Sequence, residues 1–255
     1  GPHVRTVAAP DSHRVPADDL AARFEAEVAA AAADLRAAGF GLSAMIVDTI
    51  FSSDGIYPDP SVLAPACAAV RRAGGVVITD EVQPGFARTG DAMWGFLRHG
   101  VVPDIVTMGK PMGNGLPIAA MAARAAVLDD FARGVPYFNT FGGNPVACRA
   151  ALATLDLLEG GYTKNAAERG EQLRKGLKEL PGLANVRGKG LMVAADLPSP
   201  AAKEAVIDAC FRKGLLLLGC GESALRFCPP LCVGAEQVEV ALRVLGEVLL
   251  LEFRL

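Results

Sequence analysis

Short aliphatic and β-branched runs alternate along this chain with longer stretches of helical pattern, and this alternation is the strongest constraint on the fold. The runs 44–50, 76–79 and 105–108 are too short for helices and are separated by segments with helix-forming composition. Strands that alternate with helices usually pair in parallel, with helices on both faces of the sheet. The sequence therefore predicts an α/β fold built on a mainly parallel sheet.

A domain boundary is indicated at residues 181–185, where proline and glycine interrupt the helical pattern. Beyond this segment, strand-like runs alternate with the helical stretches 199–213 and 235–253. We expect residues 1–182 to form part of a large domain and residues 183–255 to form a small C-terminal α+β domain.

The composition and net charge of the chain exclude several classes of protein. Of the 255 residues, 51% are hydrophobic and 21% are charged, which is enough apolar material for a sizeable core. The net charge of −3 argues against a nucleic-acid-binding surface. No stretch approaches the roughly 18 uninterrupted apolar residues of a membrane span, and residues 1–16 do not resemble a secretory signal. We expect a cytoplasmic protein with neither a nucleic-acid nor a membrane partner.

The six cysteines do not form a metal-binding pattern. No Cys-x-x-Cys pair occurs, and the three histidines lie far from the cysteines in the sequence. Cysteines scattered in apolar segments usually act as small buried hydrophobic residues in a reducing compartment. The sequence thus predicts no metal site.

Two carboxylates directly follow the run 76–79. The letters TDEVQ at 79–83 place Asp80 and Glu81 at the carboxyl end of a predicted strand, the edge at which ligands of α/β sheets bind. A carboxylate there can bind a metal, act as a base or hold a protonated ring nitrogen. It can equally cap a helix or lie in a surface turn, and the motif alone does not choose between these interpretations.

Lys110 lies in the glycine-rich turn MGKPMGNG, directly after the predicted strand 105–108. Burial among apolar groups disfavours an ammonium ion, lowers the pKa of a lysine and makes its amine nucleophilic, so that it can form a Schiff base. A solvated loop lysine is the alternative. The turn does not match the Walker phosphate loop, and the chain lacks the dinucleotide-binding GxGxxG fingerprint.

Two further segments carry candidate binding residues. The letters YFNTFGGNP at 137–145 precede a predicted helix, so the Thr140 hydroxyl and nearby backbone N–H groups can bind a phosphate. Capping of that helix by Asn144, with Pro145 at its first position, explains the same segment, and both interpretations can hold at once. Arg226 lies in the apolar letters LRFCPP, where a guanidinium needs an anion such as a carboxylate or a structural ion-pair partner.

In this order and at these intervals, the four motifs resemble the class III (ω-type) aminotransferases, a family of pyridoxal-phosphate enzymes of fold type I. The resemblance covers essentially the whole chain, and the four motifs together are far more specific than any one of them. The turn around Lys110 is most similar to the branch that holds alanine–glyoxylate aminotransferase 2 and the phospholyases. The resemblance implies that residues 1–182 are part of the cofactor-binding large domain.

The resemblance also implies roles for individual residues. Lys110 forms the Schiff base with pyridoxal phosphate and then transfers protons. Asp80 pairs with the pyridinium nitrogen and keeps the ring an electron sink, so that Lys110 and Asp80 are the expected catalytic residues. Gln83 contacts the phenolic oxygen of the cofactor, and Val82 packs on the face of its ring.

Two more residues are implied to act around the cofactor. Thr140 binds the phosphate of the cofactor in the neighbouring subunit, which implies a homodimer with shared active sites. Arg226 binds a substrate carboxylate. The implied reaction moves an amino group between an amine or amino acid and a keto acid or aldehyde.

Two alternatives stay open. One is a phospholyase of the same fold, which eliminates phosphate from a phosphorylated amine. The other is an inactive fragment or a non-catalytic partner, because family members are much longer than 255 residues. Neither a Gly-Ser/Thr-rich phosphate loop nor a stacking aromatic is found, so we expect the N-terminal half of the family's length to be absent. Ser53 stands where several members have a glutamate that shields the arginine, which leaves the amine donor open.

Overall fold

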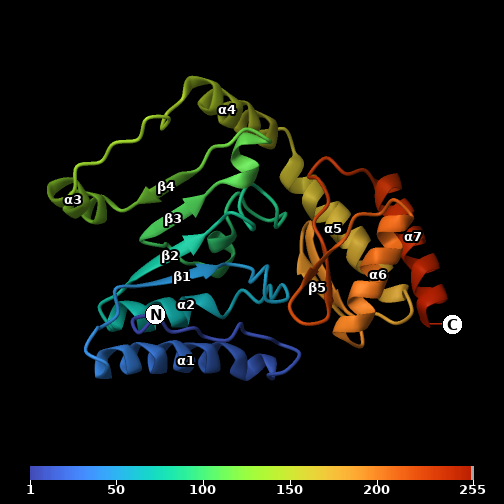
Figure 1. Cartoon of the computed structure of the whole chain (residues 1–255), viewed down its shortest axis with the longest axis horizontal. Coiled ribbons are helices and arrows are strands. Elements are labelled where there is room, and N and C mark those ends of the chain that lie inside the picture. The colour runs from blue at the N-terminus through green and yellow to red at the C-terminus, as the bar shows by residue number, and fades with distance from the viewer. Residues whose placement is uncertain (254–255) are drawn as a thin grey trace. The chain divides into compact units, whose positions relative to one another are not determined.

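The computed structural model describes residues 1–253 and shows two compact units (Figure 1). The first unit comprises residues 1–49, 59–86 and 94–160, and the second comprises residues 50–58, 87–93 and the described residues from 161 onward. Helices and strands alternate through most of the chain, which confirms the predicted α/β class.

A four-stranded sheet in the order β1-β2-β3-β4 forms the centre of the first unit. Its strands are β1 (Ala44–Asp48), β2 (Val76–Asp80), β3 (Ile105–Met108) and β4 (Ala120–Ala123). The first three strands are parallel and β4 runs antiparallel to β3, so the sheet is mainly parallel, as predicted. The β-branched residues of these runs suit the pleated surface of a buried strand.

Four helices and two short 3-10 turns complete the first unit. They are α1 (Ala17–Ala37), α2 (Leu63–Arg72), η1 (Gly95–His99), η2 (Lys110–Gly113), α3 (Ala125–Gly134) and α4 (Pro145–Glu159). Helix α2 packs against β2, and α1 packs on α2 (Figure 1). The buried face of α1 follows the helical period and consists of Leu20, Phe24, Val28, Ala32 and Leu35.

The side chains on the two faces of this sheet differ in how deeply they are buried. Val77 and Thr79 of β2 are buried, and they alternate with Ile78 and Asp80, which point to the opposite face and are only half-buried. Ile46, the β1 partner of Ile78, is 65% exposed. Asp80 therefore faces the side of the sheet that the described residues leave more open.

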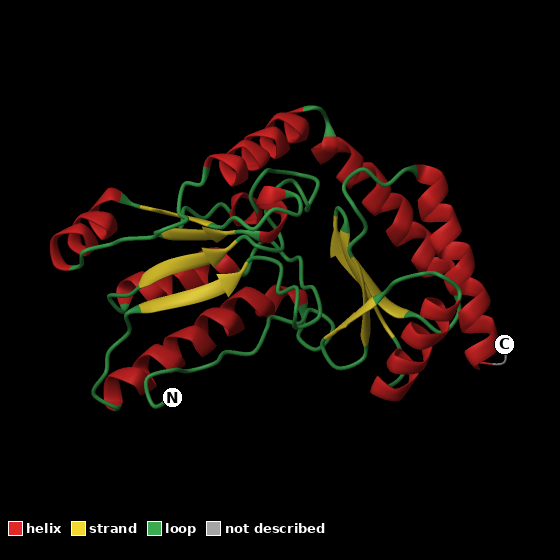
Figure 2. Ribbon diagram, turned by 45° about the horizontal axis from the view of Figure 1, so that its top comes forward, coloured by secondary structure: helices red, strands yellow, loops and turns green. Residues whose placement is uncertain are grey.

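The second unit contains an antiparallel sheet in the order β5-β6-β8-β7. Its elements are α5 (Tyr162–Glu179), β5 (Ala184–Lys189), β6 (Met192–Asp196), α6 (Pro200–Arg212), β7 (Leu218–Cys220), β8 (Ala224–Phe227) and α7 (Ala235–Phe253). The three helices lie on one side of the strands (Figure 2). The segment 50–58 lies against the other face, where Ile50 and Ile56 pack with Met192 and Ala194.

This division differs from the predicted boundary at residue 182. Helix α5 packs on β5, β6 and α7, and its Leu173 and Leu177 are buried in the core of the second unit. The segments 50–58 and 87–93 also belong to this unit although they are distant from it in sequence. Contacts between distant segments cannot be read from local periodicity, which is why the boundary differs.

The cysteines follow the prediction only in part. Burial raises the pKa of the Cys67, Cys210 and Cys220 thiols to about 11. Cys228 and Cys232 are exposed instead. Within residues 1–253, no group of three or more His, Cys, Asp or Glu side chains is arranged to hold a metal ion. None of the helices described is long and apolar enough to cross a membrane.

Candidate active site

Asp80 and Lys110 lie at the ends of two adjacent parallel strands. Asp80 is the last residue of β2 and pairs with Thr107 of β3, while Lys110 follows the end of β3 by two residues. The carboxyl ends of parallel strands are where ligands bind in α/β sheets. The structure therefore brings the two predicted catalytic residues to one edge of the sheet, although their catalytic roles stay predictions.

The turn after β2 carries the other two predicted cofactor-binding residues. The Asp80 carboxylate accepts a hydrogen bond from the Val82 N–H at 2.9 Å through Oδ1. Val82 and Gln83 are half-buried in this turn. The hydrogen bond fixes the first part of the turn, so that the Val82 backbone lies beside the Asp80 carboxylate.

Lys110 is exposed, so the described residues do not supply the apolar shelter that a reactive amine needs, and the role of Lys110 stays a prediction. Residues 114–117 of the same turn are exposed as well, whereas Gly109 and Gly113 are buried. The backbone of Lys110 is in the left-handed region with φ +40°, which is uncommon for a residue with a side chain. Strain of this kind concentrates at functional turns.

Helix α4 is capped by Asn144, as one of the two interpretations of this segment predicts. The Asn144 Oδ1 accepts hydrogen bonds from the N–H groups of Val146 and Ala147 at 3.0 and 3.2 Å. These two N–H groups are therefore occupied by the cap, and phosphate binding by Thr140 stays a prediction. The Thr140 hydroxyl remains available because Thr140 is exposed.

The loop that carries Thr140 exposes large aromatic side chains. Tyr137, Phe138 and Phe141 are 73%, 86% and 81% exposed. A depression of about 510 Å³ lies beside them, and its lining includes Leu116, Phe141 and Val146. Several large exposed aromatic side chains on one loop are typical of an interaction site.

Glu81 lies directly after Asp80, and the motif by itself does not distinguish the roles of the two acids. Its side chain is fully buried. Its carboxylate accepts hydrogen bonds from the Gly95 N–H at 2.6 Å, the Phe96 N–H at 2.9 Å and the Thr49 hydroxyl at 3.2 Å. Glu81 thus ties the end of β2 to η1 and to Thr49, and so holds the adjacent Asp80 in place. The alternation of side chains along a strand is the signal that separates the two acids, one facing the site and the other the core.

Glu81 should make the stability of the fold depend on pH. Burial raises the pKa of Glu81 from 4.5 to about 7 against the opposing effect of its hydrogen bonds. The folded chain therefore keeps a proton that the unfolded chain releases, and stability falls as pH rises through this window. We expect a loss of about 3 kcal/mol across it, measured by urea unfolding from about pH 5 to about pH 8.

Glu81→Gln should lack this loss of stability. Replacement of the exposed Glu204 by glutamine is the matched control and should leave the pH dependence unchanged. The same pH dependence in wild type and Glu81→Gln would contradict the prediction.

Arg226 lies on β8 in the second unit and has few partners. Its Nη1 donates a weak hydrogen bond to the Ser52 carbonyl at 3.5 Å. Its Nε is buried and has no acceptor among the described residues. A buried donor without an acceptor is costly, and a carboxylate matches the fork of a guanidinium. The structural ion pair that was the alternative interpretation is not seen in the part of the chain that the structure describes.

A mainly parallel α/β unit with an acid and a lysine at adjacent strand ends, together with a small antiparallel unit that carries an arginine, is the architecture of the large and small domains of a fold type I enzyme. The chain belongs to the class III aminotransferases, whose family model matches residues 1–249. This family uses pyridoxal phosphate. The resemblance seen in the four sequence motifs is therefore confirmed.

Curated relatives of this chain are aminotransferases. The chain is 38% identical over 208 residues to the acetylornithine aminotransferase of Corynebacterium efficiens, a match that covers 81% of this chain and 51% of that protein. It is 35% identical over 221 residues to the alanine–glyoxylate aminotransferase 2-like protein of Drosophila melanogaster, covering 80% of this chain and 45% of that protein. The chain thus spans about half the length of the curated relatives it matches.

Solved structures support the same fold and branch. A phospholyase from Arthrobacter in complex with phosphoethanolamine matches with a TM-score of 0.92 and 38% identity, covering 98% of this chain and 64% of that one. An ornithine aminotransferase from Toxoplasma gondii, with partial occupancy of pyridoxal phosphate, matches with a TM-score of 0.79 and 28% identity, covering 90% of this chain and 55% of that one. The fold type I prediction is confirmed by these matches.

Proposed function

We propose that this protein moves an amino group between an amine or amino acid and a keto acid or aldehyde with the help of pyridoxal phosphate. The observation that carries the proposal is the placement of Asp80 and Lys110 at the carboxyl ends of adjacent parallel strands in a chain of the class III family. The substrates and the activity of the whole protein are part of this proposal.

The residues present fit the protein side of a pyridoxal-phosphate site. Asp80 uses Oδ1 for the Val82 N–H, and its other oxygen has no hydrogen-bond partner among the described residues. That oxygen suits the proton of a ring nitrogen. Lys110 offers an accessible amine, and the half-buried Val82 and Gln83 follow the acid in the same turn. When bound, the cofactor supplies an electron sink for the substrate carbon that bears the amino group.

Three residues of the chain would each have a separate task. Asp80 would keep the ring nitrogen protonated. Lys110 would hold the cofactor and, as a free amine, move a proton to and from the substrate carbon. Arg226 would orient the substrate through its carboxylate. Because Lys110 is exposed in the described chain, we expect its shelter to come from groups outside these residues.

We also propose a homodimer in which Thr140 binds the cofactor phosphate held by the partner subunit. The exposed aromatic side chains of Tyr137, Phe138 and Phe141 next to Thr140 support this proposal, because pairing of two copies would cover them. A cytoplasmic location and the absence of nucleic-acid and membrane partners stay predictions.

A second candidate function is the elimination of phosphate from a phosphorylated amine. The similarity to the Arthrobacter phospholyase in complex with phosphoethanolamine supports it. Both reactions begin with removal of a proton from the carbon that bears the amino group. The two reactions differ in their later steps, because elimination expels phosphate from the neighbouring carbon whereas transamination passes the amino group to an acceptor.

Product analysis separates these functions. The purified protein, loaded with pyridoxal phosphate, is given an amino acid with a keto acid in one reaction and phosphoethanolamine alone in another. Transamination yields a new amino acid only when the keto acid is present, whereas elimination releases inorganic phosphate without one. If neither product forms, the proposal of catalysis by this chain is wrong and the non-catalytic interpretation is favoured.

A further inference from the structure

Arg187 and Arg226 share one face of the small sheet. Arg187 of β5 pairs with Ala194 of β6, and Ala194 pairs with Arg226 of β8. Paired residues on adjacent strands face the same side, and adjacent strands are about 4.8 Å apart. The backbones of the two arginines are therefore roughly 10 Å apart, with Ala194 between them in the register of the sheet.

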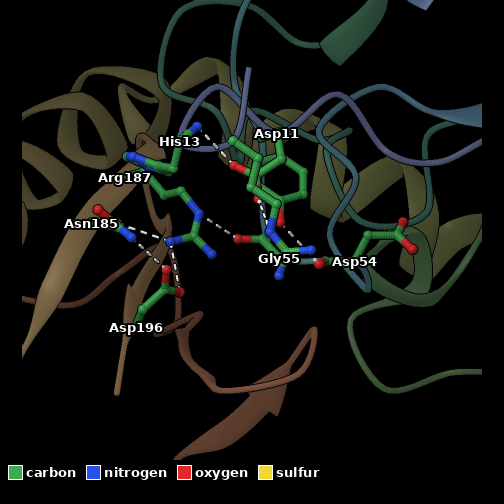
Figure 3. A network of polar contacts seen from close by, with 9 residues as sticks. Asp11, His13, Asp54, Gly55, Asn185, Arg187 and Asp196 are labelled. Carbon is green, nitrogen blue, oxygen red and sulfur yellow. Dashed lines mark hydrogen bonds and ion pairs between the residues drawn. The ribbon is translucent and has the colours of Figure 1, made fainter. Parts of the chain in front are cut away.

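Arg187 is buried and well partnered. Its Nη1 donates to Asp196 Oδ1 at 2.8 Å and to the Asn185 carbonyl at 2.9 Å, and its Nε donates to the Gly55 carbonyl at 2.9 Å (Figure 3). Its guanidinium also lies 5.3 Å from the centroid of the Tyr57 ring. The ion pair with Asp196 neutralises Arg187, so that this cation is not available to a ligand.

Arg226 differs from Arg187 in every one of these respects. Within the described part of the chain, its guanidinium forms a single hydrogen bond, to the Ser52 carbonyl at 3.5 Å, and its buried Nε has no acceptor. No carboxylate of residues 1–253 forms an ion pair with it. Of the two arginines on this face, only Arg226 is left to bind an anion.

The segment that supplies the Ser52 carbonyl is a strained loop. Phe51 and Ile56 have φ values of +53° and +64°, and both side chains are buried. The Ile56 N–H donates to the Phe51 carbonyl at 3.0 Å, and the Tyr57 N–H donates to the Ile50 carbonyl at 2.9 Å. A left-handed backbone at a β-branched residue persists only where its surroundings hold it. The loop 50–58 therefore depends on its contacts with the sheet.

Arg187 provides one of these contacts through the carbonyl of Gly55 and the ring of Tyr57. Gly55 has φ +146°, and a Cβ atom there would lie 2.6 Å from the Tyr57 hydroxyl oxygen and 3.1 Å from an Arg187 nitrogen. The close approach of the arginine thus requires glycine at this position. The same loop presents the Ser52 carbonyl to Arg226.

We propose that Arg187 is a positioning residue for substrate binding. Its ion pair with Asp196 holds Arg187 in place, and Arg187 in turn fixes the loop 50–58. The Ser52 carbonyl of this loop then orients the Arg226 guanidinium toward the carboxylate of an amino or keto acid. The inference rests on the proposed function, in which Arg226 binds that carboxylate.

Arg187→Met in the cofactor-loaded protein should raise the KM for a carboxylate-bearing substrate about tenfold, as expected for the loss of a charged hydrogen bond. The kcat should change less than about twofold, and the KM for an amine without a carboxylate should stay the same, because only orientation of Arg226 is lost. Arg187→Lys keeps a charge opposite Asp196 and should give a smaller rise, about threefold. This second variant tests the proposal even if Arg187→Met folds poorly.

Lys189→Met is the matched control. Lys189 lies on the same strand, and its Nζ is 3.6 Å from Asp91, so the variant removes an ion pair without touching the loop 50–58. We expect no change in any KM. The double variant Arg187→Met/Arg226→Gln should have the same KM as Arg226→Gln alone, because Arg187 acts through Arg226. A purely structural effect of Arg187 would add to that of Arg226.

Amide hydrogen exchange gives a readout that is independent of activity. Arg187→Met should speed exchange at Ile56 and Tyr57, and Lys189→Met should not. Unchanged exchange at these amides would contradict the proposal that Arg187 holds the loop 50–58 in place. An Arg226→Gln effect on carboxylate KM without an Arg187→Met effect would overturn the positioning role alone. No Arg226→Gln effect would overturn the proposed role of Arg226 and the positioning role with it.

Discussion

Replacing Lys110 by alanine should abolish covalent attachment of pyridoxal phosphate and lower the rate of amino transfer by roughly 10³-fold or more. The amine of Lys110 is both the group that would hold the cofactor and the group that would move the substrate proton, so both functions are lost at once. Borohydride reduction and then peptide mass analysis measure the attachment, and product formation measures the rate.

Two further variants make this prediction specific. Lys110→Arg keeps the positive charge but cannot attach the cofactor, so it should lose the reducible adduct as completely as Lys110→Ala. Replacement of the exposed Lys164 by alanine is the control and should leave both readouts unchanged. An adduct that persists on another lysine in Lys110→Ala would show that the assignment of Lys110 is wrong.

Asp104→Ala should lower the free energy of unfolding by about 4 kcal/mol, because one carboxylate joins three segments of the first unit. Asp104 is 6% exposed. Its Oδ2 accepts from the Val77 N–H at 2.9 Å and from Arg71 at 3.3 Å, while Oδ1 accepts from Arg124 at 2.9 Å. The variant leaves the Val77 N–H of the central strand β2 buried without an acceptor. Urea unfolding at neutral pH measures the loss.

The pH dependence of Asp104 has the opposite sign to that of Glu81. Burial tends to raise the pKa of Asp104, but the hydrogen bonds from Val77, Arg124 and Arg71 outweigh it and hold the pKa below 3.8. Its contribution to stability is therefore complete above the ordinary pKa of an aspartate and is lost as pH falls through the lowered value. The exposed Asp130, replaced by alanine, is the control and should change stability little. An equally small loss in Asp104→Ala would contradict the prediction.

Local sequence patterns were sufficient for β1, β2 and β3, for the helices α6 and α7, and for the placement of Asp80 and Lys110 at one edge of the sheet. Asp80 and Lys110 each follow a short β-branched run, and parallel pairing of such runs places their carboxyl ends together. Capping of α4 by Asn144 was equally visible, because an asparagine before a proline is a helix-start signal. These features depend on neighbours within a few residues, which the sequence shows directly.

Features that depend on contacts between distant segments were decided by the tertiary structure alone. The exposure of Lys110 depends on the groups that surround its turn, and no local pattern reports that. The loop 50–58 belongs to the second unit through contacts with residues more than a hundred positions away, among them the hydrogen bond from Arg187 to the Gly55 carbonyl, which the chain order does not show. The spacing of apolar residues and the residues of turns specify individual helices and strands. Burial, ion pairing and backbone strain arise only when these helices and strands pack against one another.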